Sequence, residues 1–286
     1  MVVRYAWIKD NDPEFAVQRM CRLLRVSRSG FYAWRDRAPS AREQENIELA
    51  DAVKSIFVSS RETYGSIRVQ RSLQDAGRPV GRHRVRRVMR DVGLRAVARR
   101  AFRVTTDSNH SLPVAANLLQ QNFVATAPHK VWLSDITYIK TDEGWLFLAC
   151  VLDLYSRRIV GWATSTRIDS ELIIWALSMA VWRFKPDRTI CHSDRGVQYA
   201  SQAYQDVLKQ HGLICSMSRR GNCYDNAPME SFFRTLKVEC LYRLRLRTRD
   251  EAKRAVADYI ESFYNSQRMH TRIDFQTPQQ AMRRAS

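Results

Sequence analysis

Three carboxylates stand at positions where a charged side chain is costly unless it is paired. Asp135 lies inside the apolar run Trp132–Tyr138, Asp194 ends the apolar run Thr189–Asp194, and Glu230 opens the last long amphipathic segment. Burying such a charge is unfavourable unless a partner or a metal ion offsets it. No basic neighbour in the sequence does so, and all-oxygen ligands favour Mg²⁺ or Mn²⁺ over zinc. The three acids therefore predict a divalent-metal site.

Other polar residues near these acids receive structural interpretations. Asp153 also ends a strand and competes for the metal, but we expect it to cap the turn Tyr155–Arg157. His192 lies two residues before Asp194 and is expected to hydrogen-bond within the core. Asn226 is expected to cap the helix that carries Glu230.

The elements that must position the acids begin after residue 126. Three strands in succession, followed by alternating helices and strands, predict an α/β domain with a mixed five-stranded sheet covered by helices. The predicted strands are Trp132–Ile139, Trp145–Asp153, Arg158–Thr164, Thr189–Asp194 and Ile214–Ser218, and the predicted helices are Ser170–Phe184, Ser201–His211 and Ala227–Tyr242.

The first 100 residues are predicted to be an all-α region, whose first helical unit, a helix, a turn and a second helix, spans residues 15–37. A helix, a Gly/Pro turn at 77–81 and a helix at 82–92 follow one another in the order of a helix-turn-helix. Ten arginines oppose one acid between Arg78 and Arg103. A solvated basic face is the alternative to DNA contact. The outward-facing arginines expected to contact DNA are Arg82, Arg84, Arg86, Arg87 and Arg90.

Changes in composition predict five regions. Residues 1–45 form an N-terminal helical region, and residues 46–100 form the basic helix-turn-helix-like domain. A linker over 101–126 precedes the α/β domain at 127–242, and a helical extension occupies 243–286.

The whole-chain charge restricts the class of partner. Lys and Arg number 47 against 29 Asp and Glu, a net charge of +18 over 286 residues, which favours nucleic acid or an anionic membrane surface. No apolar run approaches the roughly 18–20 residues needed to span a bilayer. The six cysteines form no CxxC pair, so a zinc site or a disulfide framework is not expected and a reducing cytosol is.

Five sequence words, in order, resemble those of a known family. They are WLSDITYI, LDLYSRRIVGW, HSDRGVQY, DNAPMESFFRTLKVE and YNSQRMHTRIDFQTP. Thirty-five residues separate Asp194 from Glu230, and Lys237 follows seven residues later. This pattern resembles the DDE signature of the retroviral-integrase superfamily, and the words resemble the second-frame (OrfB-type) transposases of IS-three family insertion sequences.

The resemblance implies a fold and a set of site residues. It implies an RNase H-like catalytic core in which Asp135, Asp194 and Glu230 hold two Mg²⁺ or Mn²⁺ ions for in-line phosphoryl transfer. Glu230 and Lys237 share a helix face, so Lys237, with Arg234 one turn away, is expected to hold a DNA phosphate. A solvated helix residue is the alternative for Lys237.

The resemblance also implies an activity and partners. We expect a transposase that cleaves and joins DNA at element ends, through a circular intermediate, in the bacterial cytoplasm at the nucleoid. Its expected partners are duplex DNA, further copies of the chain in the synaptic complex, and an upstream-frame protein joined by frameshifting. The alternatives are a DNA-binding accessory or regulatory subunit without catalysis and a nuclease that cuts RNA–DNA hybrids.

Overall fold

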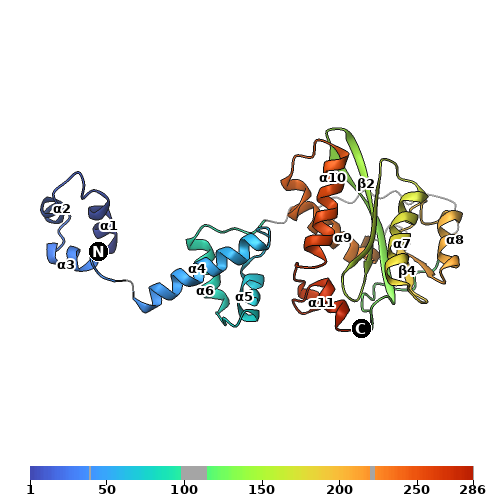
Figure 1. Ribbon diagram of the computed structural model, residues 1–286, viewed down its shortest axis with the longest axis horizontal. Coiled ribbons are helices and arrows are strands. Elements are labelled where there is room, and N and C mark those ends of the chain that lie inside the picture. The colour runs from blue at the N-terminus through green and yellow to red at the C-terminus, as the bar shows by residue number, and fades with distance from the viewer. Residues whose placement is uncertain (39, 98–114, 220–222, 286) are drawn as a thin grey trace. The chain divides into compact units, whose positions relative to one another are not determined.

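The computed structural model describes residues 1–38, 40–97, 115–219 and 223–285 (Figure 1). The chain divides into two compact units, Met1–Lys54 and Ser55–Ser286. Helix α4 (Ala41–Ser59) runs across the division.

The first unit begins with three short helices, α1 (Val2–Asp10), α2 (Val17–Leu23) and α3 (Arg28–Arg35). The Ser27 hydroxyl caps α3 by accepting a bond from the Gly30 N–H. The turn and second helix expected within residues 15–37 are confirmed, whereas the sequence analysis missed α1. The small core shared by the three helices consists of Tyr5, Ile8, Met20, Cys21 and Phe31.

The second unit opens with α5 (Ser66–Asp75) and α6 (Arg82–Asp91). The apolar face of α6 is buried through Val85, Val88 and Met89, as its helical periodicity predicts. The segment before α5 is bound to the C-terminal part of the same unit. Tyr64 donates its hydroxyl to the Gln267 carbonyl at 3.0 Å and accepts the Met269 N–H at 2.7 Å.

The predicted mixed five-stranded sheet is confirmed, in the order β3-β2-β1-β4-β5. Strands β1, β2 and β3 pair antiparallel, and β4 and β5 extend the sheet in parallel on the other side of β1. The bounds of the strands are β1 Val131–Thr141, β2 Gly144–Asp153, β3 Ile159–Ser165, β4 Ile190–Ser193 and β5 Ile214–Met217.

Helices cover both faces of this sheet (Figure 1). Helices α7 (Ser170–Phe184) and α8 (Gln202–Gln210) pack on one face, and α9 (Ala227–Glu239) and α10 (Arg249–Ala257) pack on the other. The contact of α7 with β3 requires Gly161, because a Cβ there would lie 2.1 Å from the Ala176 carbonyl oxygen.

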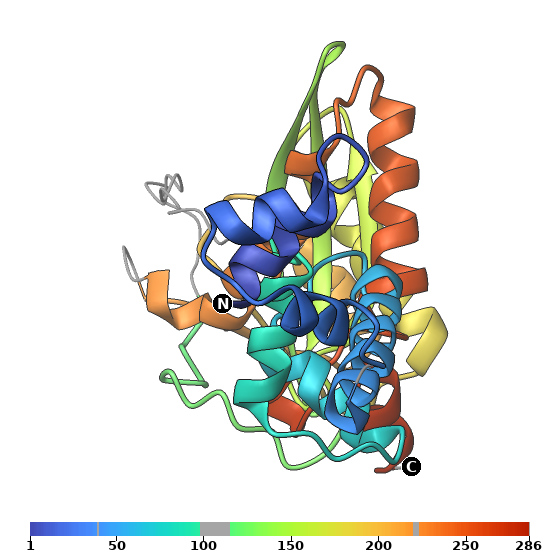
Figure 2. The same ribbon diagram turned by 90° about the vertical axis from the view of Figure 1, so that its left-hand side faces the viewer.

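The residues after α9 belong to the same core as the sheet. The helix expected over 227–242 ends at Glu239, and a separate 3₁₀ turn follows at Leu241–Arg243. Buried side chains of α10 and of the π-helical segment Asp258–Tyr264 pack with those of β1 and β2. Figure 2 shows the start of α10 beside the tip of the β1–β2 hairpin, where the Arg249 N–H donates to Glu143. Helix α11 (Pro278–Arg283) completes the chain.

Candidate active site

Asp135 and Asp194 lie on neighbouring parallel strands at the same edge of the sheet. Leu133 of β1 pairs with His192 of β4. Asp135 lies two residues further along β1, and Asp194 lies two residues after His192, just past the end of β4. Because side chains alternate along a strand, Asp135 lies on the same face as Leu133, which packs in the core beneath α9. The parallel pairing therefore brings two acids 59 positions apart in the sequence to one place.

Two hydrogen bonds hold the start of α9 against this edge. The Asn226 amide donates to the Ser134 carbonyl at 3.2 Å, one residue before Asp135. His192 lies 3.0 Å from the Asp225 carbonyl through its Nε2 atom. Glu230 follows within the first turn of α9, so these bonds place it near the two aspartates.

The electrostatics of Asp135 show that the three acids affect one another. Burial raises the pKa of Asp135 well above its usual value, and the charges of Asp194 and Glu230 raise it further. The Ile136 N–H, 2.8 Å from the carboxylate, and Lys237 act in the opposite direction. Burial also raises the pKa of Glu230.

Few protein donors reach Asp135 and Glu230. Among described residues, only the Ile136 N–H is a hydrogen-bond donor to Asp135, and none donates to Glu230. Asp194 accepts the Gly196 N–H at 2.9 Å. Across the described ranges, no three His, Cys, Asp or Glu side chains lie close enough together to hold one metal ion among them. The oxygen donors nevertheless fit Mg²⁺ or Mn²⁺, since raised pKa values mark carboxylates that would gain from a cation.

Lys237 lies two turns after Glu230 and is 6% exposed. Its Nζ atom is 4.7 Å from the centre of the Tyr138 ring. Burial lowers the pKa of Lys237, and the charge of Asp135 partly opposes this effect. A solvated helix residue, the alternative weighed from the sequence, is therefore wrong. Arg234, one turn nearer to Glu230, is half-buried.

Asp153 has the structural role expected of it. It is fully buried, and its carboxylate accepts bonds from the His129 N–H at 2.8 Å, the Ser156 N–H at 2.8 Å and the Ser156 hydroxyl at 2.6 Å. These bonds cap the turn that follows β2. With its oxygens occupied by donors, Asp153 has no need of a cation.

His192 also has the expected structural role, and Asn226 differs from expectation. His192 is buried, and its Nδ1 atom lies 2.8 Å from the Ser216 hydroxyl. Asn226 stands at the N-cap position of α9, but its side chain makes no cap bond and instead donates to Ser134. The expected capping bond was wrong because β1 offers the amide a carbonyl acceptor.

The sequence analysis did not single out Asp225, which is 1% exposed. Its carboxylate accepts bonds from Asn117 at 2.9 Å, from Gln121 at 3.0 Å and from the Arg219 backbone N–H at 2.8 Å. With the Arg219 guanidinium as the largest cause, these bonds lower the pKa of Asp225 to about 2. Asp225 adjoins Asn226 in the sequence word DNAPMES, but nothing in that word distinguishes a satisfied acid from a reactive one.

The arginines predicted to contact DNA lie on α6 and not among the strands that carry the acids. Arg82, Arg86, Arg87 and Arg90 are exposed, and Arg84 is half-buried. An exposed basic surface suits phosphate contact, and the DNA-binding role of these arginines stays a prediction.

Family models match three parts of the chain. An integrase core domain matches residues 125–223, a second integrase core model matches 230–281, and an HTH-like domain matches 43–102.

No helix among the described residues has the length and apolar character to cross a membrane.

Two similar sequences illustrate the relatives of this chain. The transposase InsF for insertion sequence IS3A of Escherichia coli (strain K12) is 43% identical over 97% of this chain and 98% of that protein. The insertion element IS600 uncharacterized 31 kDa protein of Shigella sonnei is 49% identical over 89% of this chain and 94% of that protein.

Solved structures show a weaker likeness. An intasome of simian T-cell lymphotropic virus, in complex with PP2A regulatory subunit B56 gamma, covers 74% of this chain and 70% of its own with a TM-score of 0.48 and 18% identity. The HTLV-2 integrase catalytic core domain in complex with magnesium covers 56% of this chain and 99% of its own with a TM-score of 0.45 and 16% identity.

Proposed function

The chain belongs to the IS3 family of transposases, and on that premise we propose that Asp135, Asp194 and Glu230 are its catalytic acids. It is a DNA transposase with an integrase core. The observation that carries the assignment of these residues is the pairing of β1 with β4, which sets Asp135 and Asp194 side by side beneath the start of α9. A DNA-binding subunit without catalysis would not need Asp135 and Glu230, whose pKa values burial raises, beside a third acid at that place.

The acids are proposed to act as ligands of two Mg²⁺ or Mn²⁺ ions. Bound there, the metals would activate the attacking water or DNA 3′-OH and stabilise the leaving oxygen of the phosphoryl transfer. The contribution of the chain is to orient the carboxylates that would bind the cations. Ile136 and Gly196 orient Asp135 and Asp194 through their N–H groups. The Asn226 bond fixes the helix that carries Glu230.

The basic residues near the acids are proposed to hold DNA. Lys237 lies within electrostatic range of Asp135, so its charge moderates the repulsion among the acids and faces a phosphate brought to them. Arg234 is proposed to assist it. Arg82, Arg84, Arg86, Arg87 and Arg90 are proposed to grip duplex DNA through its backbone, which predicts strong salt dependence of binding.

The larger assembly is also part of the proposal. Joining two element ends through a circular intermediate requires that both ends meet, so we propose that copies of the chain associate in the synaptic complex. We further propose that an upstream-frame protein, joined by frameshifting, assists recognition of the ends. Comparing end cleavage by the chain alone and by the fusion tests this part, and equal end cleavage by both would contradict it.

The decisive experiment for the acids is a strand-transfer assay with labelled element-end DNA and Mg²⁺. Wild type and Glu230→Gln are compared with Glu171→Gln, which removes a charge from the exposed first turn of α7. We expect strand transfer to disappear only in Glu230→Gln. Undiminished strand transfer by Glu230→Gln would overturn the assignment.

A metal-preference test separates a ligand from a structural residue. A thiolate is a softer ligand than a carboxylate, so Asp135→Cys is expected to lose activity with Mg²⁺ and regain part of it with Mn²⁺. Parallel reactions on an RNA–DNA hybrid distinguish DNA joining from hybrid cleavage. Hybrid cleavage without DNA joining would favour a nuclease of the RNase H type.

A further inference from the structure

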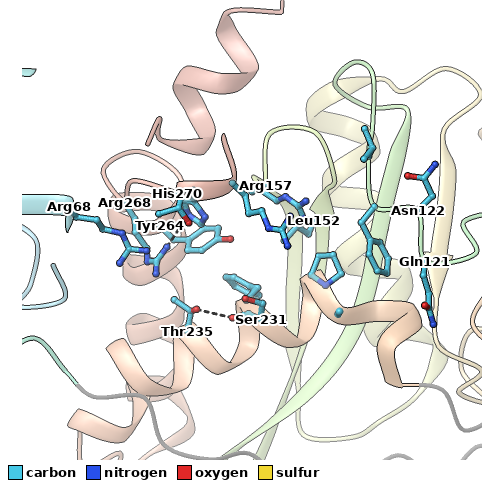
Figure 3. Close-up of a pocket in the computed structure, with 17 residues that line it drawn as sticks. Arg68, Gln121, Asn122, Leu152, Arg157, Ser231, Thr235, Tyr264, Arg268 and His270 are labelled. Carbon is cyan, nitrogen blue, oxygen red and sulfur yellow. Dashed lines mark hydrogen bonds between the residues drawn. The ribbon is translucent and has the colours of Figure 1, made fainter. Parts of the chain in front are cut away.

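A second site candidate lies on a different face of α9 from the acids. A cavity of about 490 Å³ is bounded by α9, by residues 121–124 and by the C-terminal segment 264–272 (Figure 3). Ser231 and Thr235 line it, one turn apart, whereas Glu230 and Lys237 do not. Its volume falls within the range of about 300–1,000 Å³ typical of ligand pockets.

The cavity is lined by four arginines and no acid: Arg68, Arg157, Arg268 and Arg272. They come from three separate parts of the sequence, and two of them, Arg268 and Arg272, belong to the word YNSQRMHTRIDFQTP, to which the acid site gives no role. Figure 3 shows Arg68 and Arg268 at one end of the cavity and Arg157 nearer its middle.

Only part of this positive charge is neutralised. Arg268 forms a two-bond ion pair with Glu239, at 2.8 and 2.7 Å. Arg157 and Arg272 form no ion pair with any carboxylate in the described ranges. Burial lowers the pKa of the Arg157 guanidinium, and the charge of Arg272 lowers it further. Two guanidiniums therefore line the cavity without an ion pair to a carboxylate among the described residues.

The pKa of His270 reflects the same excess of positive charge. Burial lowers its pKa well below the usual value, and the charges of Arg268, Arg68 and Arg157 lower it further. Three of the arginines thus act together on one buried ring in the wall of the cavity. An anion at this place would offset the repulsion among them.

Aromatic side chains complete the lining. Phe123, Phe232 and Tyr264 line the cavity with the arginines. Phe232 and Tyr264 are buried in the core, so the aromatic wall open to a ligand is formed mainly by the half-buried Phe123. In Figure 3 the hydroxyl end of Tyr264 points towards the side where Arg157 lies. Guanidiniums bind phosphate oxygens in pairs, and aromatic rings stack on bases without regard to sequence. The combination suits one nucleotide of a DNA strand better than a small inorganic ion alone.

We propose that this arginine pocket binds a backbone phosphate of a DNA strand, with the adjoining base against the aromatic wall. The proposal rests on the proposed function, because it takes the strand to be the DNA on which the transposase acts. It gives the C-terminal motif a task in holding DNA that is separate from the acids.

The test measures binding without chemistry. A labelled single-stranded oligonucleotide and a duplex with an unpaired end are titrated in EDTA, in a Glu230→Gln background, over a range of salt concentrations. The variants are Arg157→Gln and Arg272→Gln. The matched control is Arg188→Gln, which removes an exposed arginine from the loop before β4. Arg268 is left intact because its ion pair is buried.

We expect each pocket substitution to weaken binding about tenfold and to reduce the salt slope by about 0.7 for single-stranded DNA. The affinity of the control variant for DNA should stay within about twofold of the wild-type affinity. Thermal melting should show that all variants are folded. Equal effects of Arg188→Gln and the pocket substitutions would overturn the proposal, because any lost charge would then suffice.

Inorganic phosphate distinguishes the source of the anion. If phosphate raises the melting temperature of wild type and Arg157→Gln still binds DNA with unchanged affinity, the pocket is a site for free phosphate. That result would overturn the proposal that it binds DNA. Competition by phosphate against the oligonucleotide would support it. Because binding is measured without metal or turnover, failure here leaves the strand-transfer test of the acids intact, and failure of that test leaves this one intact.

Discussion

The two glutamates of α9 occupy opposite environments. Glu239 receives two bonds from Arg268 and one from the Tyr259 hydroxyl at 2.7 Å. Glu230, nine residues earlier on the same helix, receives none from any described residue, and burial raises its pKa. The same contrast separates Asp153 and Asp225, which are fully hydrogen-bonded, from Asp135.

This difference shows how one fold can hold acids for two purposes. A carboxylate whose oxygens are occupied by N–H and O–H donors stabilises the fold and has little left for a cation. A carboxylate that is buried but poorly compensated costs free energy until a metal binds. The predictions below test whether the two sets of acids separate in this way.

The largest effect is expected at the proposed catalytic aspartates. Asp135→Asn and Asp194→Asn should each reduce the strand-transfer rate by roughly a thousandfold or more, equivalent to about 4 kcal/mol. The free energy of unfolding should stay unchanged or increase, because a like charge has been removed from the cluster. Strand-transfer rates and denaturant melts check both parts. A large loss of stability would show that Asp135 and Asp194 stabilise the fold, as Asp153 and Asp225 are expected to do.

Glu239→Gln is expected to show the reverse behaviour. Removing one partner from a buried ion pair leaves the Arg268 guanidinium uncompensated at 4% side-chain exposure and should cost about 3 kcal/mol or more of folding free energy. Urea melts measure the loss. Glu230→Gln is the matched control on the same helix. If both variants lose the same free energy of unfolding, the two glutamates do not differ in the way proposed.

Asp153→Asn should destabilise the protein by about 2 kcal/mol. The new amide would turn an N–H group towards the donors of His129 and Ser156, which now bond to the carboxylate. Urea melts of Asp153→Asn and Asp135→Asn, compared directly, measure the difference. If Asp153→Asn is as stable as wild type, the hydrogen bonds at the end of β2 do not stabilise the fold.

Asp225 predicts a pH dependence whose sign is fixed by its depressed pKa. Its contribution to stability is present above the unfolded value near 3.8 and is lost as the pH falls towards about 2. Asp225→Asn should therefore lower the free energy of unfolding by about 1–2 kcal/mol at pH 6. Below pH 4 the difference in this free energy between the variant and wild type should become smaller. Denaturant midpoints at pH 6, 4 and 3 measure this gap. If the difference in unfolding free energy stays constant with pH, ionised Asp225 does not stabilise the fold.

The smallest effect is expected next to Asp194. A Cβ on Gly196 would lie 3.1 Å from the Asp194 carboxylate and 3.0 Å from the Gln198 side chain. Gly196→Ala should slow strand transfer about fivefold, equivalent to about 1 kcal/mol, and raise the Mg²⁺ concentration required. Gly65→Ala is the control, since a Cβ there meets nothing within 4 Å. Equal rates in wild type and Gly196→Ala would show that Asp194 tolerates the displacement.

The sequence predicted much of the catalytic unit because its signals are local. Apolar runs of strand length and the amphipathic spacing of the helices predicted all five strands and helices α7, α8 and α9 to within a few residues. Helix α10 was predicted only as part of a helical extension over 243–286. Helix α1 was missed because only Tyr5 and Ile8 of its residues are buried, too few to form a periodic pattern. The end of α9 was placed late because the apolar spacing continues through Leu241 after the helix has ended.

By itself, the sequence determined which residue types could bind a metal, their spacing along the chain and the positive charge suited to DNA. Only the tertiary structure decided which acids are left open. The donors that satisfy Asp225 come from Asn117 and Gln121, about a hundred positions away, and the partner of Glu239 is Arg268 in another segment. The arginine pocket likewise joins Arg68 to Arg272. Hydrogen bonding and Coulomb attraction depend on distance in space, and the folded chain sets those distances.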